Sequence, residues 1–266
     1  LLPMFPMREK ASLAGIVTTT EAAVNKLGFF SRRHFWTSSC LSSGGLRSDK
    51  FCDPPKDQVM PPPVDVSKVT MVCNDDQLKA LIEHLETVPV FAVDLEHHSY
   101  KSYLGLTCLM QITTGTGGDF VVDVLEVWNS MYLLNRVFTK QDIVFHGGKN
   151  DIQCLQRDFN IYVVGMFDTL EAAKILQLHT SSLEHLISRY CKIKPEEIQN
   201  VFFWWDRPLP EYVLKSAITE THYLVYIYGQ MGKELLNKAY GETSMYAEVA
   251  PLSTAEFHTV RISLIY

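Results

Sequence analysis

Phe91-Ala92-Val93-Asp94-Leu95-Glu96 is an apolar run that ends in two acidic residues spaced two positions apart. The run from 88 to 93 is short and rich in β-branched and aromatic residues, which predicts a buried strand. Side chains alternate along a strand, so Asp94 and Glu96 are expected on one face at its carboxyl end. Because such close like charges repel and lose hydration, they predict a divalent cation between them. A strand that ends in solvent is the alternative.

The segments before and after this strand predict an antiparallel meander. A short strand is expected over 69–72, followed by a helix that Asn74 caps and whose apolar residues recur at helical spacing. Two further strands are expected over 107–113 and 119–123, with a glycine-rich turn between them. Three consecutive strands with short connections predict antiparallel pairing.

The second half of the chain predicts β-α units. Strands are expected over 143–146 and 162–167, each followed by a helix, and the helix after the first begins behind Gly147-Gly148. Further helices are expected over 182–191 and from Pro210 to about Lys238. The sequence therefore predicts an α/β fold with a mixed five-stranded sheet flanked by helices.

Composition limits the classes of function. The chain has 266 residues and a net charge of −6, which argues against a broad basic surface for nucleic acid but not against a deep local site. No stretch has the apolar length of a membrane span, so we expect no membrane partner. The six cysteines lack C-x-x-C spacing, and we interpret them as reduced thiols.

The two ends of the chain differ in composition from the middle. Residues 1–65 are basic and contain serine and proline, which predicts a disordered arm that ends in a stiff Pro61-Pro62-Pro63 linker. The same composition is typical of an organelle transit peptide, which leaves a mitochondrial location open. The folded domain is expected over 66–240, and the pattern does not assign residues 241–266.

Other acidic residues could join Asp94 and Glu96. Sites in open α/β sheets form at the carboxyl ends of strands, and Asp151 follows such an end through the Gly147-Gly148 turn. Glu220 lies on a strongly apolar helix, where an acid is usually on the solvated face. Asp168 stands directly before a helix, and we interpret it as a structural N-cap.

The arrangement of these acids resembles the DEDD superfamily of 3′–5′ exonucleases, which have a ribonuclease-H-like fold, and in particular its RNase D-like branch that acts with the nuclear exosome. The resemblance covers roughly 69–238. The stretches that carry it are Asp94-Leu95-Glu96-His97-His98-Ser99-Tyr100, Leu104 to Ile112, Val144-Phe145-His146-Gly147, Asp151-Ile152, Leu155 to Phe159, Tyr162 to Val164, Met166 to Thr169, Arg207 to Pro210 and Thr221 to Leu224.

The resemblance implies hydrolysis of RNA from its 3′ end to nucleoside monophosphates with two divalent ions, Mg²⁺ or Mn²⁺. The implied metal ligands and catalytic residues are Asp94, Glu96, Asp151 and Glu220. The implied substrate-binding residues are His97, His98, Tyr100 and His146. The implied partners are single-stranded RNA 3′ ends and the nuclear exosome core with its cofactors, and the implied location is the nucleus and nucleolus.

The later part of the chain departs from the family pattern. Glu220 replaces an aspartate, and Ser216 replaces the tyrosine that orients the attacking water. Cys154 stands where a tryptophan near the nucleotide is usual, Phe202 to Asp206 differ from the family's Ala-Asp-Trp-Arg, and the helicase-and-RNase-D C-terminal domain does not follow. Two hypotheses therefore stay open, an active exoribonuclease and an inactive RNA-binding or scaffolding relative. A DNA-directed exonuclease of the same fold is a third.

Overall fold

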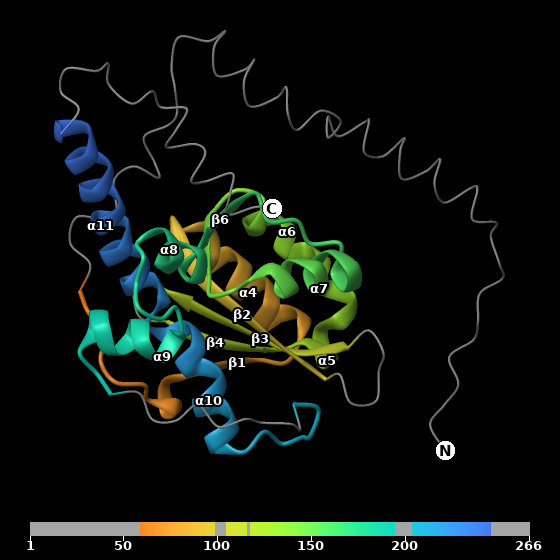
Figure 1. The fold of residues 1–266 in the computed structure, drawn as a ribbon. Coiled ribbons are helices and arrows are strands. Elements are labelled where there is room, and N and C mark those ends of the chain that lie inside the picture. Colours follow the sequence, from red (N-terminus) through yellow and green to blue (C-terminus); the bar gives the residue numbers. More distant parts are fainter. Residues whose placement is uncertain (1–58, 99–104, 116–117, 195–203, 246–266) are drawn as a thin grey trace, which may run out of the picture. The chain divides into compact units, whose positions relative to one another are not determined.

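The computed structural model describes residues 59–98, 105–115, 118–194 and 204–245, all within one compact unit that comprises Cys52–Tyr266 (Figure 1). The predicted arm before residue 59, the tail after 245 and Tyr100 lie outside the described residues. The predicted domain boundaries at 65 and 240 therefore stay predictions.

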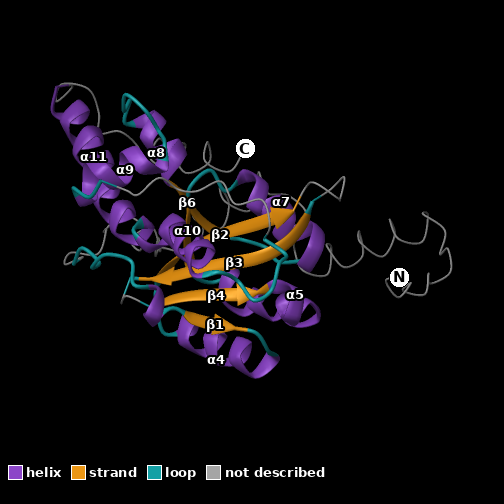
Figure 2. Cartoon of the chain, turned by 90° about the horizontal axis from the view of Figure 1, so that it is seen from below, coloured by secondary structure: helices purple, strands orange, loops and turns teal. Residues whose placement is uncertain are grey.

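A six-stranded mixed sheet forms the centre of the fold, with the order β1-β4-β3-β2-β5-β6. Figure 2 shows β2, β3, β4 and β1 side by side in this order. The strands are β1 (Thr70–Val72), β2 (Val90–His98), β3 (Leu106–Thr114), β4 (Asp119–Asp123), β5 (Asp142–Phe145) and β6 (Gly165–Asp168).

The predicted meander is confirmed, since β2 pairs antiparallel with β3 and β3 pairs antiparallel with β4. The prediction of five strands is wrong. The short strand β1 pairs in parallel with β4 and becomes the sixth, so the otherwise open edge of β4 has a partner. On the other side β5 and β6 add in parallel, as β-α units do.

Two predicted strand limits are wrong. Asp94 and Glu96 lie inside β2 rather than at its end, because pairing with β3 continues to His98 through a register shift between Glu96 and His97. The last strand begins at Gly165 rather than at Tyr162. The Tyr162 backbone N–H donates instead to Asn135 Oδ1 at 3.0 Å, so this residue does not enter the strand ladder.

The larger hydrophobic core lies between the sheet and the helices of the first half. These elements are α4 (Asp75–Glu86), α5 (Val124–Val127), the 3₁₀ helix η2 (Trp128–Leu134), α6 (Asn135–Phe138) and α7 (Lys149–Phe159). The predicted cap of α4 is confirmed, because Asn74 Oδ1 accepts a hydrogen bond from Gln77 N at 3.0 Å. Figure 1 shows α5, α6 and α7 gathered on one side of the domain.

Most of the remaining helices follow β6 in the chain. They are α8 (Thr169–Ile175), α9 (Leu183–Leu186), the π-helical turn η3 (Ile187–Cys191), α10 (Glu211–His222) and α11 (Leu224–Met245), and a single 3₁₀ turn, η1 (Val66–Lys68), precedes the sheet. The helix predicted from Pro210 onward is therefore two helices that meet at Tyr223. Helix α10 packs on β2, β3 and β4 and closes a second core with Cys108, Val121 and Trp204.

Two further expectations can be compared with this fold. Within the described residues, no helix combines the length and the apolar character needed to cross a membrane. Of the six cysteines, the four in the described part of the chain are free thiols.

An ion pair between the partly exposed Arg207 and the buried Asp123 fixes the segment that leads into α10. The Arg207 guanidinium donates to both carboxylate oxygens of Asp123 at the end of β4, with 2.7 Å from Nη2 to Oδ1. It also donates to the carbonyl oxygen of Trp204 at 2.8 Å. The Asp123 side chain is 5% exposed, and Arg207 is the cation that offsets its loss of hydration.

Replacing Arg207 should therefore destabilise the protein. We expect Arg207→Met to lower the free energy of unfolding by about 3 kcal/mol, because it leaves a buried carboxylate without its cation. Urea denaturation measures this change. The matched control is Arg136→Met, which breaks a pair with Glu86 whose side chains are 57% and 35% exposed and should cost no more than about 1 kcal/mol. Equal losses in the two variants would contradict the prediction.

Candidate active site

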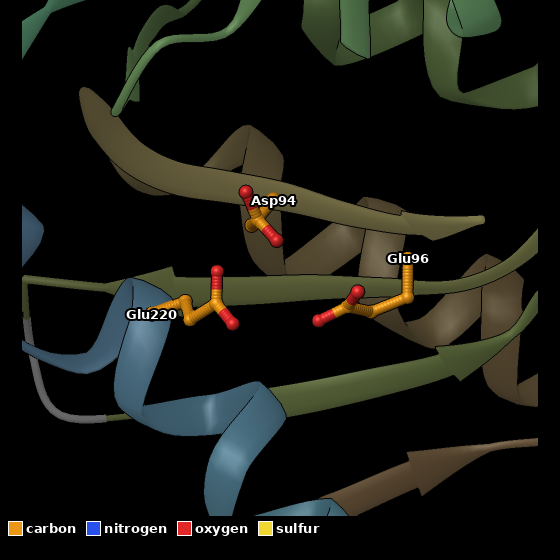
Figure 3. A group of neighbouring side chains, drawn as sticks. All are labelled: Asp94, Glu96 and Glu220. Carbon is orange, nitrogen blue, oxygen red and sulfur yellow. The ribbon is translucent and has the colours of Figure 1, made fainter. Parts of the chain in front are cut away.

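Three of the predicted acids converge above the sheet. Asp94 and Glu96 from β2 and Glu220 from α10 each present a carboxylate oxygen, and these atoms all lie within 4.8 Å of one another. Figure 3 shows the three carboxyl groups turned toward a common centre. All three side chains are half-buried, so the alternatives of a strand end in solvent and a solvated helix face are both wrong.

A buried hydrogen-bond network fixes the end of α10 that carries Glu220. Thr113 Oγ1 on β3 lies 2.8 Å from Thr221 Oγ1 and donates to Asp119 Oδ1 on β4 at 2.8 Å. His222 Nδ1 lies 2.8 Å from Asp119 Oδ2, and His222 Nε2 lies 2.8 Å from the Pro62 carbonyl oxygen. Because Thr221 and His222 directly follow Glu220, these bonds determine where its side chain enters the site.

The surroundings of the three acids disfavour their charged forms. Burial, together with the neighbouring carboxylates, raises the pKa of Asp94 well above its usual value. Burial and then the charge of Glu220 raise the pKa of Glu96 to about 9. Burial and then the charge of Glu184 raise the pKa of Glu220 to about 7. A cation with oxygen ligands would offset these costs, so the donor set fits the divalent metal that the sequence predicts.

Asp151 lies near this cluster but outside the group of three. It is buried in the first turn of α7, and its charge contributes to the raised pKa of both Asp94 and Glu96. Burial, followed by the charges of Asp168 and Glu220, raises its own pKa to about 7. The structure therefore brings the four predicted acids into one electrostatic unit, of which three share a common centre.

Asp168 has the structural role that was predicted and a second role that was not. Its Oδ1 accepts from Leu170 N at 2.9 Å, which confirms the N-cap of α8. Its carboxylate also accepts from Gly147 N at 2.9 Å and from Gly148 N at 3.1 Å. These bonds hold the turn from which α7 and Asp151 start.

The predicted substrate-binding histidines on β2 occupy different environments. His97 is exposed, whereas His98 is buried and its ring centroid lies 3.7 Å from that of Trp205. Trp205 belongs to the segment that departs from the family pattern, and no role was expected for it from the sequence. In the structure it makes an aromatic contact with a predicted substrate-binding histidine. Tyr100 is not among the described residues, and its role stays a prediction.

His146 is held in one orientation at the end of β5. Its Nδ1 lies 2.9 Å from Thr169 Oγ1, and that hydroxyl donates to the Phe145 carbonyl oxygen at 3.1 Å. Since the hydroxyl proton is used in this bond, Nδ1 is the donor and Nε2 carries the lone pair of the neutral ring. Burial lowers the pKa of His146, which favours this neutral form.

Two of the positions that depart from the family pattern, Ser216 and Cys154, each lie about one helical turn from one of the four acids. Ser216 is buried on α10 one helical turn before Glu220. Cys154 is buried on α7, three residues after Asp151. Arg157 Nη2 lies 3.8 Å from the Cys154 sulfur. The family substitutions therefore affect the immediate surroundings of the site rather than the sheet.

The sequence analysis missed Gln111 as a site residue. Gln111 lies directly opposite Asp94 in the pairing of β2 with β3, and its Nε2 donates to Glu96 Oε1 at 3.2 Å. Two signals were available: Gln111 belongs to the stretch Leu104 to Ile112 that carries the resemblance, and it lies in the predicted meander, where a residue opposite Asp94 shares its face of the sheet. The exact register was needed to identify it.

The comparisons with known proteins agree with this geometry. The model of the 3′-5′ exonuclease family matches residues 69–236. The chain belongs to this family. It is 46% identical over 182 residues to human Exosome complex component 10, an alignment that covers 68% of this chain and 20% of that protein.

Solved structures give the same fold. The catalytic core of RRP6 from Trypanosoma brucei superposes with a TM-score of 0.65 at 36% identity and covers 71% of this chain and 53% of that one. Escherichia coli RNase D superposes with a TM-score of 0.58 at 21% identity, covering 65% and 46% of the two chains, which supports the ribonuclease-H-like fold alone. The chain spans about a fifth of the length of the human relative, so that protein's activity is not transferred with the fold.

The raised pKa values predict how stability depends on pH. Acids whose pKa is higher in the folded than in the unfolded state bind more protons when folded, so the free energy of unfolding falls as pH rises. With folded values of about 7 for Asp151 and Glu220 and about 9 for Glu96, we expect the metal-free protein to melt several degrees lower at pH 8 than at pH 5.5. Thermal melts in EDTA measure this difference.

Bound metal ions should oppose this loss of stability at high pH. Mn²⁺ or Mg²⁺ should raise the melting temperature more at pH 8 than at pH 5.5, because protons compete with the cation for the carboxylates. Asp94→Asn, which removes one of the coupled acids, should reduce both the pH dependence and the metal effect. A metal-free protein that is more stable at pH 8 than at pH 5.5 would contradict this account.

Proposed function

We propose that this chain is a metal-dependent 3′–5′ exoribonuclease that releases nucleoside monophosphates from single-stranded RNA 3′ ends. The observation that carries the proposal is the convergence of Asp94, Glu96 and Glu220 within 4.8 Å in a member of the 3′-5′ exonuclease family. The similarity to human Exosome complex component 10 and to the catalytic core of RRP6 from T. brucei supports an enzyme of the exosome. RNA as the substrate rests on the resemblance of the sequence motifs to the RNase D-like branch.

The proposed roles follow from the charge and position of each side chain. Asp94, Glu96 and Glu220 hold divalent cations, and Asp151 supports them from the start of α7. Bound Mg²⁺ or Mn²⁺ supplies an activated water and neutralises the charge that develops on the phosphate. The carboxylates keep these ions in place, while the burial of the cluster limits competing bulk water.

The last nucleotide is assigned to residues around the acids. We assign His97, His98 and His146 to this role, together with Tyr100, which lies outside the described residues. The lone pair on His146 Nε2 can accept a hydrogen bond from a sugar hydroxyl. Because only a few nucleotides need to bind, a net charge of −6 is compatible with this role. The proposed setting is RNA processing, including ribosomal RNA maturation, with the nuclear exosome in the nucleus and nucleolus.

Degradation of a labelled RNA tests the proposal. With Mg²⁺ or Mn²⁺, a 5′-labelled single-stranded RNA should shorten one nucleotide at a time from its 3′ end, and a matched DNA strand should shorten more slowly. Asp94→Asn should reduce the rate at least 100-fold, since several kcal/mol of transition-state stabilisation are lost at about 1.4 kcal/mol per tenfold.

Asp76→Asn is the matched control for this test. It removes the same charge from a side chain that is 94% exposed on α4, away from the cluster, and should leave the rate unchanged. Equal shortening of RNA by the parent and by Asp94→Asn would overturn the enzyme proposal. Faster degradation of the DNA strand would favour a DNA-directed exonuclease.

An inactive RNA-binding or exosome-scaffolding relative is the second candidate. Ser216 favours it, because a short hydroxyl side chain replaces the tyrosine that orients water in the family, and the longer Glu220 replaces an aspartate. Metal sites lose activity with displacements well below 1 Å, so both changes matter even though the charge is kept.

Restoring the family residues separates the two candidates. If the parent is inactive, Ser216→Tyr combined with Glu220→Asp should create RNA degradation that the parent lacks. Because Ser216 is buried, a melting curve must accompany the assay to detect overpacking. A parent that degrades RNA at a rate comparable to the double variant would exclude the inactive candidate.

A further inference from the structure

Gln111 contains one of the few buried polar atoms that the fold leaves unsatisfied. In the part of the chain that the structure describes, two buried side-chain polar atoms have no hydrogen-bond partner, His84 Nε2 and Gln111 Oε1. The Gln111 side chain is fully buried. Such an atom costs stability unless a water or an ion satisfies it, so it indicates a partner that the protein chain does not supply.

The position of Gln111 identifies where that partner lies. Gln111 is opposite Asp94 on the neighbouring strand, and its Nε2 donates to Glu96 Oε1. Because Nε2 and Oε1 are bonded to the same carbon, Oε1 also lies beside the Glu96 carboxyl. Two residues further along β3, Thr113 contacts Thr221 next to Glu220, so the same side of the strand faces α10.

The amide direction also fits the charge of the site. With a cation bound, Glu96 is a carboxylate and cannot donate a hydrogen bond, so the donor atom Nε2 faces Glu96 and leaves the acceptor Oε1 for another group. An acceptor surrounded by acids needs a cation or a water whose protons a cation has polarised.

We infer that Gln111 is a positioning residue for the cation site: Nε2 holds Glu96, and Oε1 accepts a hydrogen bond from a water molecule in the coordination shell of the bound divalent ion. The inference rests on the metal dependence in the proposed function. It adds a neutral residue from β3 to a site otherwise built from acids on β2, α7 and α10.

Metal affinity, measured without RNA, tests the inference. Isothermal titration of the full chain with Mn²⁺ at pH 7.5 should give about 10–100-fold weaker binding for Gln111→Met, the usual effect of losing a group that supports metal ligands. Methionine keeps the length and volume of glutamine but has no amide. Gln111→Glu restores an acceptor oxygen and should bind Mn²⁺ more tightly than Gln111→Met.

The melting temperature of the metal-free protein gives a second measurement, which distinguishes a role in metal binding from a purely structural role. Because Gln111→Met removes an unsatisfied buried acceptor, its metal-free melting temperature should stay within a few degrees of the parent value while Mn²⁺ affinity falls. Should Gln111→Met fail to fold, Gln111→Asn carries the test, since it keeps the amide but is one methylene too short for both contacts. The same loss of affinity is then expected.

Gln141→Met is the matched control. Gln141 is a half-buried glutamine whose Nε2 donates to the carbonyl oxygens of Leu85 and Glu86, and its loss should leave Mn²⁺ affinity unchanged. Mn²⁺ binding by Gln111→Met within twofold of the parent would overturn the inference, and so would a parent that binds no Mn²⁺. A parent that binds Mn²⁺ but leaves RNA intact would overturn only the proposed function.

Discussion

Repulsion among crowded, half-buried carboxyl groups is the constraint on which the rest of this structure depends. Asp94, Glu96 and Glu220 place oxygen atoms within 4.8 Å of one another, and burial raises the pKa of all three. No local preference of β2 or α10 would produce this arrangement, because each acid is more stable in water. The sheet and its packed helices must hold the acids together against this cost, and a bound cation can recover it.

The scaffold meets this requirement at the two ends of α10. Before the helix, Arg207 ties the incoming segment to Asp123 at the end of β4. At the end of the helix, His222 and Thr221 are bonded to Asp119 and Thr113 where β3 turns into β4. The same hairpin therefore anchors α10 on both sides of Ser216 and Glu220. The part of the site that departs from the family pattern is thus rigidly connected to the part that matches it.

The predictions from sequence are correct where the type of a residue and the periodicity of its neighbours indicate the same structure. The alternation of Asp94 and Glu96, the Asn74 and Asp168 caps and the meander all follow from short-range patterns, and the structure confirms them. The predictions are wrong where pairing between distant segments decides the outcome. The end of β2 depends on its register with β3, the sixth strand depends on β1 reaching β4, and Gln111 becomes a site residue only because that register places it opposite Asp94.

Glu220 illustrates why the substituted half of the site cannot be judged from residue type alone. Its extra methylene would displace the carboxylate if the helix stayed fixed, yet one of its oxygens lies within 4.8 Å of an oxygen of Asp94 and of Glu96 in the structure. Ser216 lies one helical turn before Glu220 and is smaller than the tyrosine of the family. The side-chain volume lost at position 216 is therefore close to the methylene gained at position 220. Loss of the tyrosine removes the hydroxyl that orients the attacking water in the family, and the side chain of Ser216 is too short to place its own hydroxyl at the same point. Metal binding and catalysis can therefore separate in this chain: the acids can retain the ion even if the water beside it is no longer oriented.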